Sequence, residues 1–103
     1  MYTVLVKYRL PRPVPREALL EGFKQAIPKF ENAPGLIRKY FCYDEAAHTG
    51  HSVYLMESEE VARAFFNDTF MEAMKGTFQA TPELFFVDTL LVIEQGKVTA
   101  NPA

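Results

Sequence analysis

The sequence lacks the motifs that would assign a reaction directly. It contains no GxSxG element, no Walker-type phosphate loop, no CxxC pair and no HExxH pattern. By its spacing, each of these patterns positions a nucleophile, a phosphate, a redox pair or a zinc ion. Hydrolase, nucleotide and standard zinc chemistry are therefore without support in these 103 residues.

Positive charge and cysteine are also scarce. The 11 basic residues are scattered and the formal net charge is −2, which does not predict binding to nucleic acid or anionic lipid. The single cysteine, Cys42, cannot form an internal disulfide, and its apolar neighbours predict a reduced, buried thiol. No run approaches the ~18 apolar residues of a membrane helix, and no signal-peptide pattern begins the chain. We expect a cytoplasmic protein that binds neither nucleic acid nor membrane.

Hydrophobic periodicity predicts one domain over residues 1–94 and a tail over 95–103. Alternation predicts a strand over 2–9, and spacings of three and four predict a helix over 16–32 that Pro28 kinks or breaks near its end. Strands over 36–44 and 52–57 flank a polar hairpin loop. Ser58 is expected to cap a helix that breaks at 67–69 and continues over 70–78. The apolar run over 83–94 predicts the last strand, and the tail is either mobile or a strap on a partner.

This order of elements is the ferredoxin-like βαββαβ motif, an α+β fold with both helices on one face of a four-stranded antiparallel sheet. The last strand is apolar on both faces, with Leu84 and Phe86 on one and Phe85 and Val87 on the other. Because the helices cover only one face, the other is expected to be an association surface. A homodimer that closes two such faces into a barrel is the predicted arrangement.

The same patterns assign the faces of two elements. In the first helix the predicted apolar stripe is Leu20, Phe23, Ile27 and Phe30. In the second strand, strict alternation places one set of side chains on one face and a second set on the other. These sets are Leu36, Tyr40 and Cys42 against Ile37, Phe41 and Tyr43.

Three polar residues could carry chemistry, each with a plainer alternative. His48 and His51 lie in the hairpin region near acidic residues, so they are either metal ligands or solvated loop residues, and we favour the second. Asp88 is a lone carboxyl in an apolar strand. If buried it would have a raised pKa suited to acid–base work, and the alternative is an ion pair with a basic residue on a neighbouring strand or a place at the barrel rim.

Several aromatic and methionine side chains could line a cavity between helices and sheet. Aromatic residues at regular spacing more often form a simple core, but strand tyrosines need hydrogen-bond partners that a pocket with a few polar points can supply. The set comprises Tyr8, Tyr40, Tyr43, Tyr54, Phe65, Phe66, Phe70, Met56, Met71 and Met74.

Three features together resemble the YdhR-like monooxygenases of the dimeric α+β barrel superfamily. They are the turn Asn32-Ala33-Pro34-Gly35 before the strand that bears Lys39, the strand of Tyr54 running into an acidic helix start, and the break before Phe70. The resemblance covers nearly the whole chain. It implies a homodimeric barrel with a pocket in each subunit. Related antibiotic-biosynthesis monooxygenases oxidise quinols and anthrones with molecular oxygen and no metal or flavin.

The resemblance also implies roles for single residues. Tyr54, Met56 and Phe65 would shape a pocket for a small aromatic ligand, and no cofactor would be required. Many barrel monooxygenases, including the heme-degrading branch, carry tryptophan where Met56 stands, and this chain has no tryptophan. The candidates for handling a proton are Lys39, Tyr40, His51 and Asp88.

Two other functions fit the same fold. A non-enzymatic barrel would bind an apolar metabolite without oxidising it, as a ligand-binding or stress-response protein. An isomerase or lactone-processing barrel would act without oxygen. The leading prediction is a cofactor-independent monooxygenase for an electron-rich aromatic.

Overall fold

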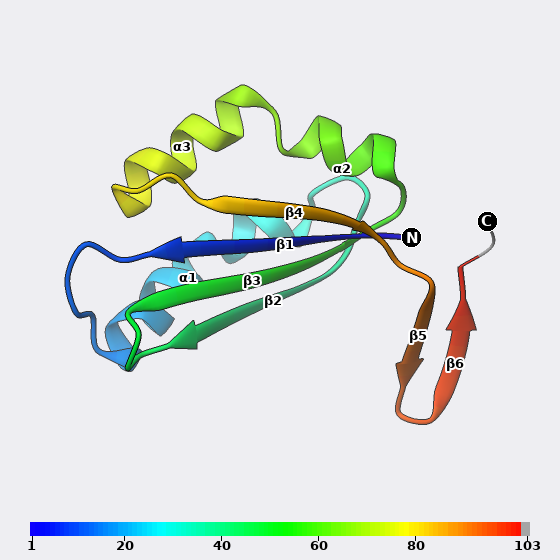
Figure 1. The fold of residues 1–103 in the computed structure, drawn as a ribbon, viewed down its shortest axis with the longest axis horizontal. Helices are drawn as coiled ribbons and strands as arrows, with labels where there is room; N and C mark the ends of the chain where they lie inside the picture. The colour runs from blue at the N-terminus through cyan, green and yellow to red at the C-terminus, as the bar shows by residue number, and fades with distance from the viewer. Residues whose placement is uncertain (102–103) are drawn as a thin grey trace.

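A computed structural model describes residues 1–101 as an α+β fold with three helices and a four-stranded antiparallel sheet (Figure 1). The sheet order β2-β3-β1-β4 fits the predicted ferredoxin-like fold. No helix in this part of the chain is long and apolar enough to cross a membrane. In chain order the elements are β1 (Tyr2–Arg9), α1 (Arg16–Glu31), β2 (Leu36–Asp44), β3 (Thr49–Met56), α2 (Glu59–Phe65), α3 (Asp68–Phe78), β4 (Glu83–Asp88), β5 (Leu91–Glu94) and β6 (Lys97–Ala100).

The core lies between the helices and one face of the sheet. The predicted alternation of β1 is confirmed, because every second side chain from Tyr2 to Tyr8 is buried. Val4 pairs with Tyr54 of β3, and both side chains are almost completely buried. Burying apolar side chains of this size contributes about 2 kcal/mol each. The two central strands therefore anchor the fold.

Side-chain caps fix the starts of α2 and α3. The Ser58 hydroxyl accepts a hydrogen bond of 3.1 Å from the Val61 amide, and the Asn67 carboxamide oxygen accepts one of 2.9 Å from the Phe70 amide. Each cap satisfies an amide that the helix itself leaves unpaired. The predicted helix start at Ser58 is confirmed. A break is also present, but it lies at residues 66 and 67, because Asp68 and Thr69 already belong to α3.

Helix α1 continues through Pro28 to Glu31 and has no side-chain cap of its own. Instead, the turn between β2 and β3 supplies one, because the Arg16 amide donates a 2.9 Å hydrogen bond to the Glu45 carboxylate. The predicted stripe of α1 is partly wrong. Leu20 and Ile27 are exposed at its margins, and Leu19 packs on the core in their place.

A bulge in β2 overturns the predicted faces of that strand. The register with β3 shifts between Leu36 and Arg38, so one residue is inserted and the alternation reverses. Leu36 therefore shares a face with Phe41, whereas Tyr40 and Cys42 lie on the opposite face. The predicted burial of the Cys42 thiol is wrong, since no helix covers that face and the residue is exposed.

The predicted last strand is also wrong in its second half. β4 ends at Asp88, and the chain then forms a separate hairpin from β5 and β6, which stands away from the sheet (Figure 1). Gln95 and Gly96 form its turn with positive φ angles. The Asn101 side chain ties its end to the body through hydrogen bonds with both Met1 and Asp88. The boundary predicted at 94/95 falls at the end of β5, where this turn begins, and residues 97–100 are a paired strand.

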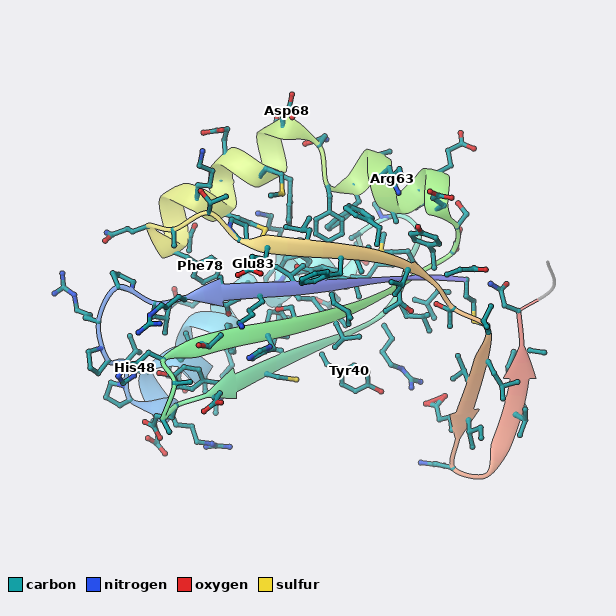
Figure 2. All side chains as sticks on the ribbon, in the orientation of Figure 1. Tyr40, His48, Arg63, Asp68, Phe78 and Glu83 are labelled. Atoms are coloured by element: carbon teal, nitrogen blue, oxygen red, sulfur yellow. The ribbon has the colours of Figure 1, made fainter. Side chains whose placement is uncertain are left out.

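The face of the sheet away from the helices is apolar and open. Its exposed large apolar side chains come from β1, β2 and β4, and Tyr40 marks this side in Figure 2. A surface of this kind is unusual in a protein that stays monomeric. The large apolar residues on it are Leu5, Ile37, Tyr40, Phe85 and Val87.

Candidate functional site

A cavity of about 320 Å³ lies between α1, α3 and the covered face of the sheet. Helix α1 contributes no fully buried residue to it, and the Phe23 and Phe30 rings of this helix pack against Phe41 of β2. Seven aromatic residues, two lysine amines and the hydroxyl groups of Ser52 and Thr77 line its walls, a composition that suits a small apolar ligand with a few polar atoms. The main lining residues are Tyr8, Phe23, Lys29, Phe30, Lys39, Phe41, Ser52, Tyr54, Phe70, Met74 and Phe78.

The amine of Lys39 is the chemically distinctive group of this cavity. Its Nζ atom lies 3.4 Å from the ring centroid of Phe30, 3.9 Å from that of Phe41 and 4.5 Å from that of Tyr54. The β2 bulge turns this side chain toward the helices, and its strand partner is Tyr54. The face of each ring attracts a cation. Lys39 is thus held by aromatic rings, and no carboxylate of residues 1–101 forms an ion pair with it.

The environment lowers the pKa of Lys39 from 10.5 to about 7. Burial is the larger cause, because a charged amine loses hydration in the cavity, and repulsion from Lys29 adds to it. The aromatic faces oppose this change by favouring the ammonium form. A substantial fraction of Lys39 is therefore a neutral amine near pH 7, able to accept a proton.

Lys29 brings a second positive charge to the same cavity. It is exposed on α1, and its Nζ atom lies 4.9 Å from the ring centroid of Phe70 and 5.8 Å from that of Phe30. The side chain therefore stands at the mouth between α1 and α3. Among residues 1–101, none of those that line the cavity is acidic.

Two tyrosines supply hydroxyl groups to the cavity wall. Burial raises the pKa of both Tyr8 and Tyr54, so they stay protonated and can donate hydrogen bonds. The Tyr8 ring stacks on Phe78 at 3.9 Å between centroids and lies over Gly50, where a Cβ atom would overlap it. Phe78 points from α3 toward the sheet in Figure 2. This packing fixes the Tyr8 side chain at one end of the cavity.

Of the three residues predicted to shape a pocket, one lines the cavity and two do not. Tyr54 lines the cavity itself. Phe65 packs against Tyr54, with 5.9 Å between ring centroids, and supports it from behind. Met56 is completely buried in the core and does not line the cavity.

Of the four predicted proton handlers, only Lys39 lines the cavity. Tyr40 and His51 lie on the open face of the sheet, because the β2 bulge and the strand alternation direct them away from the helices. Asp88 is exposed at the end of β4, where it accepts a 3.2 Å hydrogen bond from the Asn101 side chain. It forms no ion pair with a basic residue in the described chain.

Tyr43, a predicted pocket residue, and His48, weighed as a metal ligand or a solvated loop residue, both lie outside the cavity. The Tyr43 hydroxyl donates a 2.6 Å hydrogen bond to the Val14 carbonyl oxygen, outside the cavity. The imidazole of His48 has a buried Nδ1 atom with no partner. Within residues 1–101 no group of three or more His, Cys, Asp or Glu side chains is arranged to hold a metal ion.

Sequence reasoning missed several residues of the cavity. The periodicity of α1 predicts Phe23 and Phe30 as core residues, whereas their rings line the cavity and pack against Phe41 of β2. Lys29 gave no signal, because a lysine near the end of a helix is ordinarily a solvated residue that complements the helix dipole. A comparison with models of protein families and a comparison with curated proteins both give no match to this chain.

Proposed function

We propose that the protein is a cofactor-independent monooxygenase that oxidises a small electron-rich aromatic with molecular oxygen. The observation that carries this proposal is the Lys39 amine, which sits in an aromatic cavity with its pKa lowered to about 7. A base with a pKa near the working pH is the most effective proton acceptor. The resemblance to YdhR-like monooxygenases supports the same reaction class.

The proposed chemistry needs little from the protein. Neutral Lys39 accepts a proton from the bound quinol or anthrone, and the hydroxyl groups of Tyr8 and Tyr54 donate hydrogen bonds to the resulting oxyanion. The electron-rich anion then reacts with oxygen. For an anthrone, one oxygen atom enters the substrate, the other leaves as water, and the CH₂ group becomes a carbonyl. The substrate supplies all four electrons, and Lys39 returns its proton to the departing water.

Oxygen uptake tests this reaction. We expect uptake with a panel of anthrones and hydroquinones, and its loss in Lys39→Met. Lys24→Met is the matched control, since Lys24 lies outside the cavity on α1 and pairs with Glu21. Saturable binding without oxygen uptake for every compound would reject the proposal.

A ligand-binding barrel without catalysis is the second candidate. One observation favours it: Tyr40, His51 and Asp88 lie outside the cavity, so Lys39 has no titratable partner there other than Lys29 and the protonated tyrosines. Such a protein would bind the same aromatic compounds and leave oxygen untouched. The uptake measurement separates the two candidates.

We further propose that two copies pair through their open sheet faces to form a dimeric barrel. Phe85 and Val87 of β4 are each about half exposed, at 50% and 44%, and would be covered by the partner's equivalent strands. We expect a dimer in sedimentation experiments and a monomer after Phe85→Glu. Gln25→Glu on the outer side of α1 adds the same charge as a control and leaves the dimer intact. A monomeric wild type at micromolar concentration would reject this arrangement.

A further inference from the structure

The cavity holds two lysines and no counter-charge. Lys29 and Lys39 both line it, and its other walls are aromatic, aliphatic or hydroxyl groups. Neither lysine takes part in an ion pair within residues 1–101. Glu31 and Arg38 share a second groove with Lys39 between α1 and β2, but the Glu31 carboxylate is more than 4 Å from either amine.

This pattern differs from that of other helical lysines of the chain. Lys24 on α1 pairs with Glu21 at 3.2 Å, and Lys75 on α3 pairs with Glu72 at 3.7 Å. Both pairs lie outside the cavity, where surface lysines commonly find an acidic neighbour one turn away. In the cavity, by contrast, the charge that acts on Lys39 is that of Lys29, which has the same sign.

The positive charge of Lys29 repels that of Lys39, because the burial of Lys39 reduces the screening by water. A single negative charge placed between them would reverse this repulsion and make two charge-assisted hydrogen bonds. The hydroxyl groups of Tyr8, Ser52 and Tyr54 could donate further hydrogen bonds, since all three line the same space. The aromatic walls provide contact for a flat ring.

We propose that the ligand of this cavity is a small aromatic compound that carries a carboxylate, held between Lys29 at the mouth and Lys39 on the sheet. The volume of about 320 Å³ suits a ligand of two or three fused rings. This inference names the substrate class of the proposed function and rests on it in taking the cavity as the binding site. The requirement for negative charge is independent of the reaction with oxygen.

Proton uptake on binding would accompany this recognition. The groups that face Lys39 are Lys29 from α1 and Tyr54 from β3, with Glu31 and Arg38 further out, and the lining residues of α3 carry no charge. A bound carboxylate offsets the repulsion from Lys29 and raises the pKa of Lys39. Near pH 7, where part of Lys39 is neutral in the free protein, the complex must therefore take up a fraction of a proton.

Calorimetry with 2-naphthoate and 2-naphthalenemethanol tests the inference, because the two probes share a ring system and differ in charge. We expect naphthoate to bind about tenfold more tightly at low salt. Lys29→Gln and Lys39→Gln should each remove most of that preference, while Lys24→Gln, on the outer surface of α1, should leave it unchanged. Titrations in two buffers of different ionisation enthalpy should show proton uptake for naphthoate alone.

Equal affinity for the two probes would overturn the inference, as would no saturable binding of naphthoate or an equal loss in Lys24→Gln. The result is separable from that of the proposed function. If naphthoate is preferred but no anthrone consumes oxygen, the oxidation fails and the ligand class stands. If neutral and carboxylated anthrones are oxidised with equal kcat/KM, the ligand class fails and the oxidation stands.

Discussion

The Nζ atom of Lys39 lies 3.4 Å from the centroid of the Phe30 ring, so a strand lysine and a helix aromatic meet inside the protein. Two forces act on this amine in opposite directions. The ring faces favour the ammonium form, whereas burial and the charge of Lys29 favour the neutral amine. Because burial is the larger effect, Lys39 can be both a base and a stabiliser of an anion.

Lys39→Met should stabilise the fold at neutral pH, because it removes the cost of burying a charge. We expect a gain of about 2 kcal/mol in unfolding free energy, less than the full pKa change implies, since the amine is only partly buried and the rings offset part of the cost. The pKa is 10.5 in the unfolded chain and about 7 in the fold. The cost is therefore complete below pH 7, declines as pH rises to 10.5, and is absent above it.

Urea unfolding of the wild type and of Lys39→Met across pH 6–10 measures the difference in their unfolding free energies. Groups that titrate in the same way in the two proteins do not affect this difference. The gap in stability should narrow steadily above pH 7. A gap that stays constant across this range would show that Lys39 has an ordinary pKa in the fold.

The rate of aromatic oxidation should rise with pH through about 7, as Lys39 loses its proton and becomes a base. In Lys29→Gln the repulsion is removed, so the pKa of Lys39 and the midpoint of the profile should move to higher pH. Profiles of kcat/KM against pH for the wild type and this variant make the comparison. An unchanged midpoint would mean that Lys29 does not act on the base, and Lys24→Gln provides the control for loss of a surface charge.

Gly50→Ala should destabilise the protein because its Cβ atom would overlap the Tyr8 ring. We expect a loss of about 1–3 kcal/mol, together with altered ligand affinity as Tyr8 shifts against Phe78. Gly76→Ala is the matched control. Gly76 lies within α3 with open space around it, so alanine there should stabilise the helix by about 0.5–1 kcal/mol. Equal thermal stability of the two variants would contradict this account of Gly50.

Asn67→Ala should loosen α3 at its start by leaving the Phe70 amide without its cap. The expected cost is about 1 kcal/mol, and hydrogen exchange should quicken in the first turn of α3. Because Phe70 also lines the cavity, affinity for aromatic ligands should fall. Asn67→Ser keeps an oxygen acceptor at the cap and should retain most of the wild-type stability and binding. If the serine and alanine variants behave alike, the cap is not the cause.

Local chemistry explains why much of the fold could be read from the sequence. The alternation of β1 depends only on the two-residue period of a strand, and the caps at Ser58 and Asn67 depend on contacts three residues apart. The turn at Gly35 likewise required a residue that accepts a φ of 78° beside Val61. Among the site residues, the local pattern also predicts Tyr54 as a pocket residue and places Lys39 on the second strand.

What the sequence determined by itself was the order of elements from β1 to β4, the helix starts and an apolar excess on the predicted last strand, because each follows from neighbours a few residues apart. Only the tertiary structure decided which side chains share the cavity. The inserted residue between Leu36 and Arg38 turns Lys39 inward and Tyr40 and Cys42 outward, and the close approach of α1 to β2 brings Lys29 to the same cavity. The orientation of the β2 side chains and the position of Lys29 both depend on contacts between segments that are distant in the chain. A local sequence pattern does not predict such contacts.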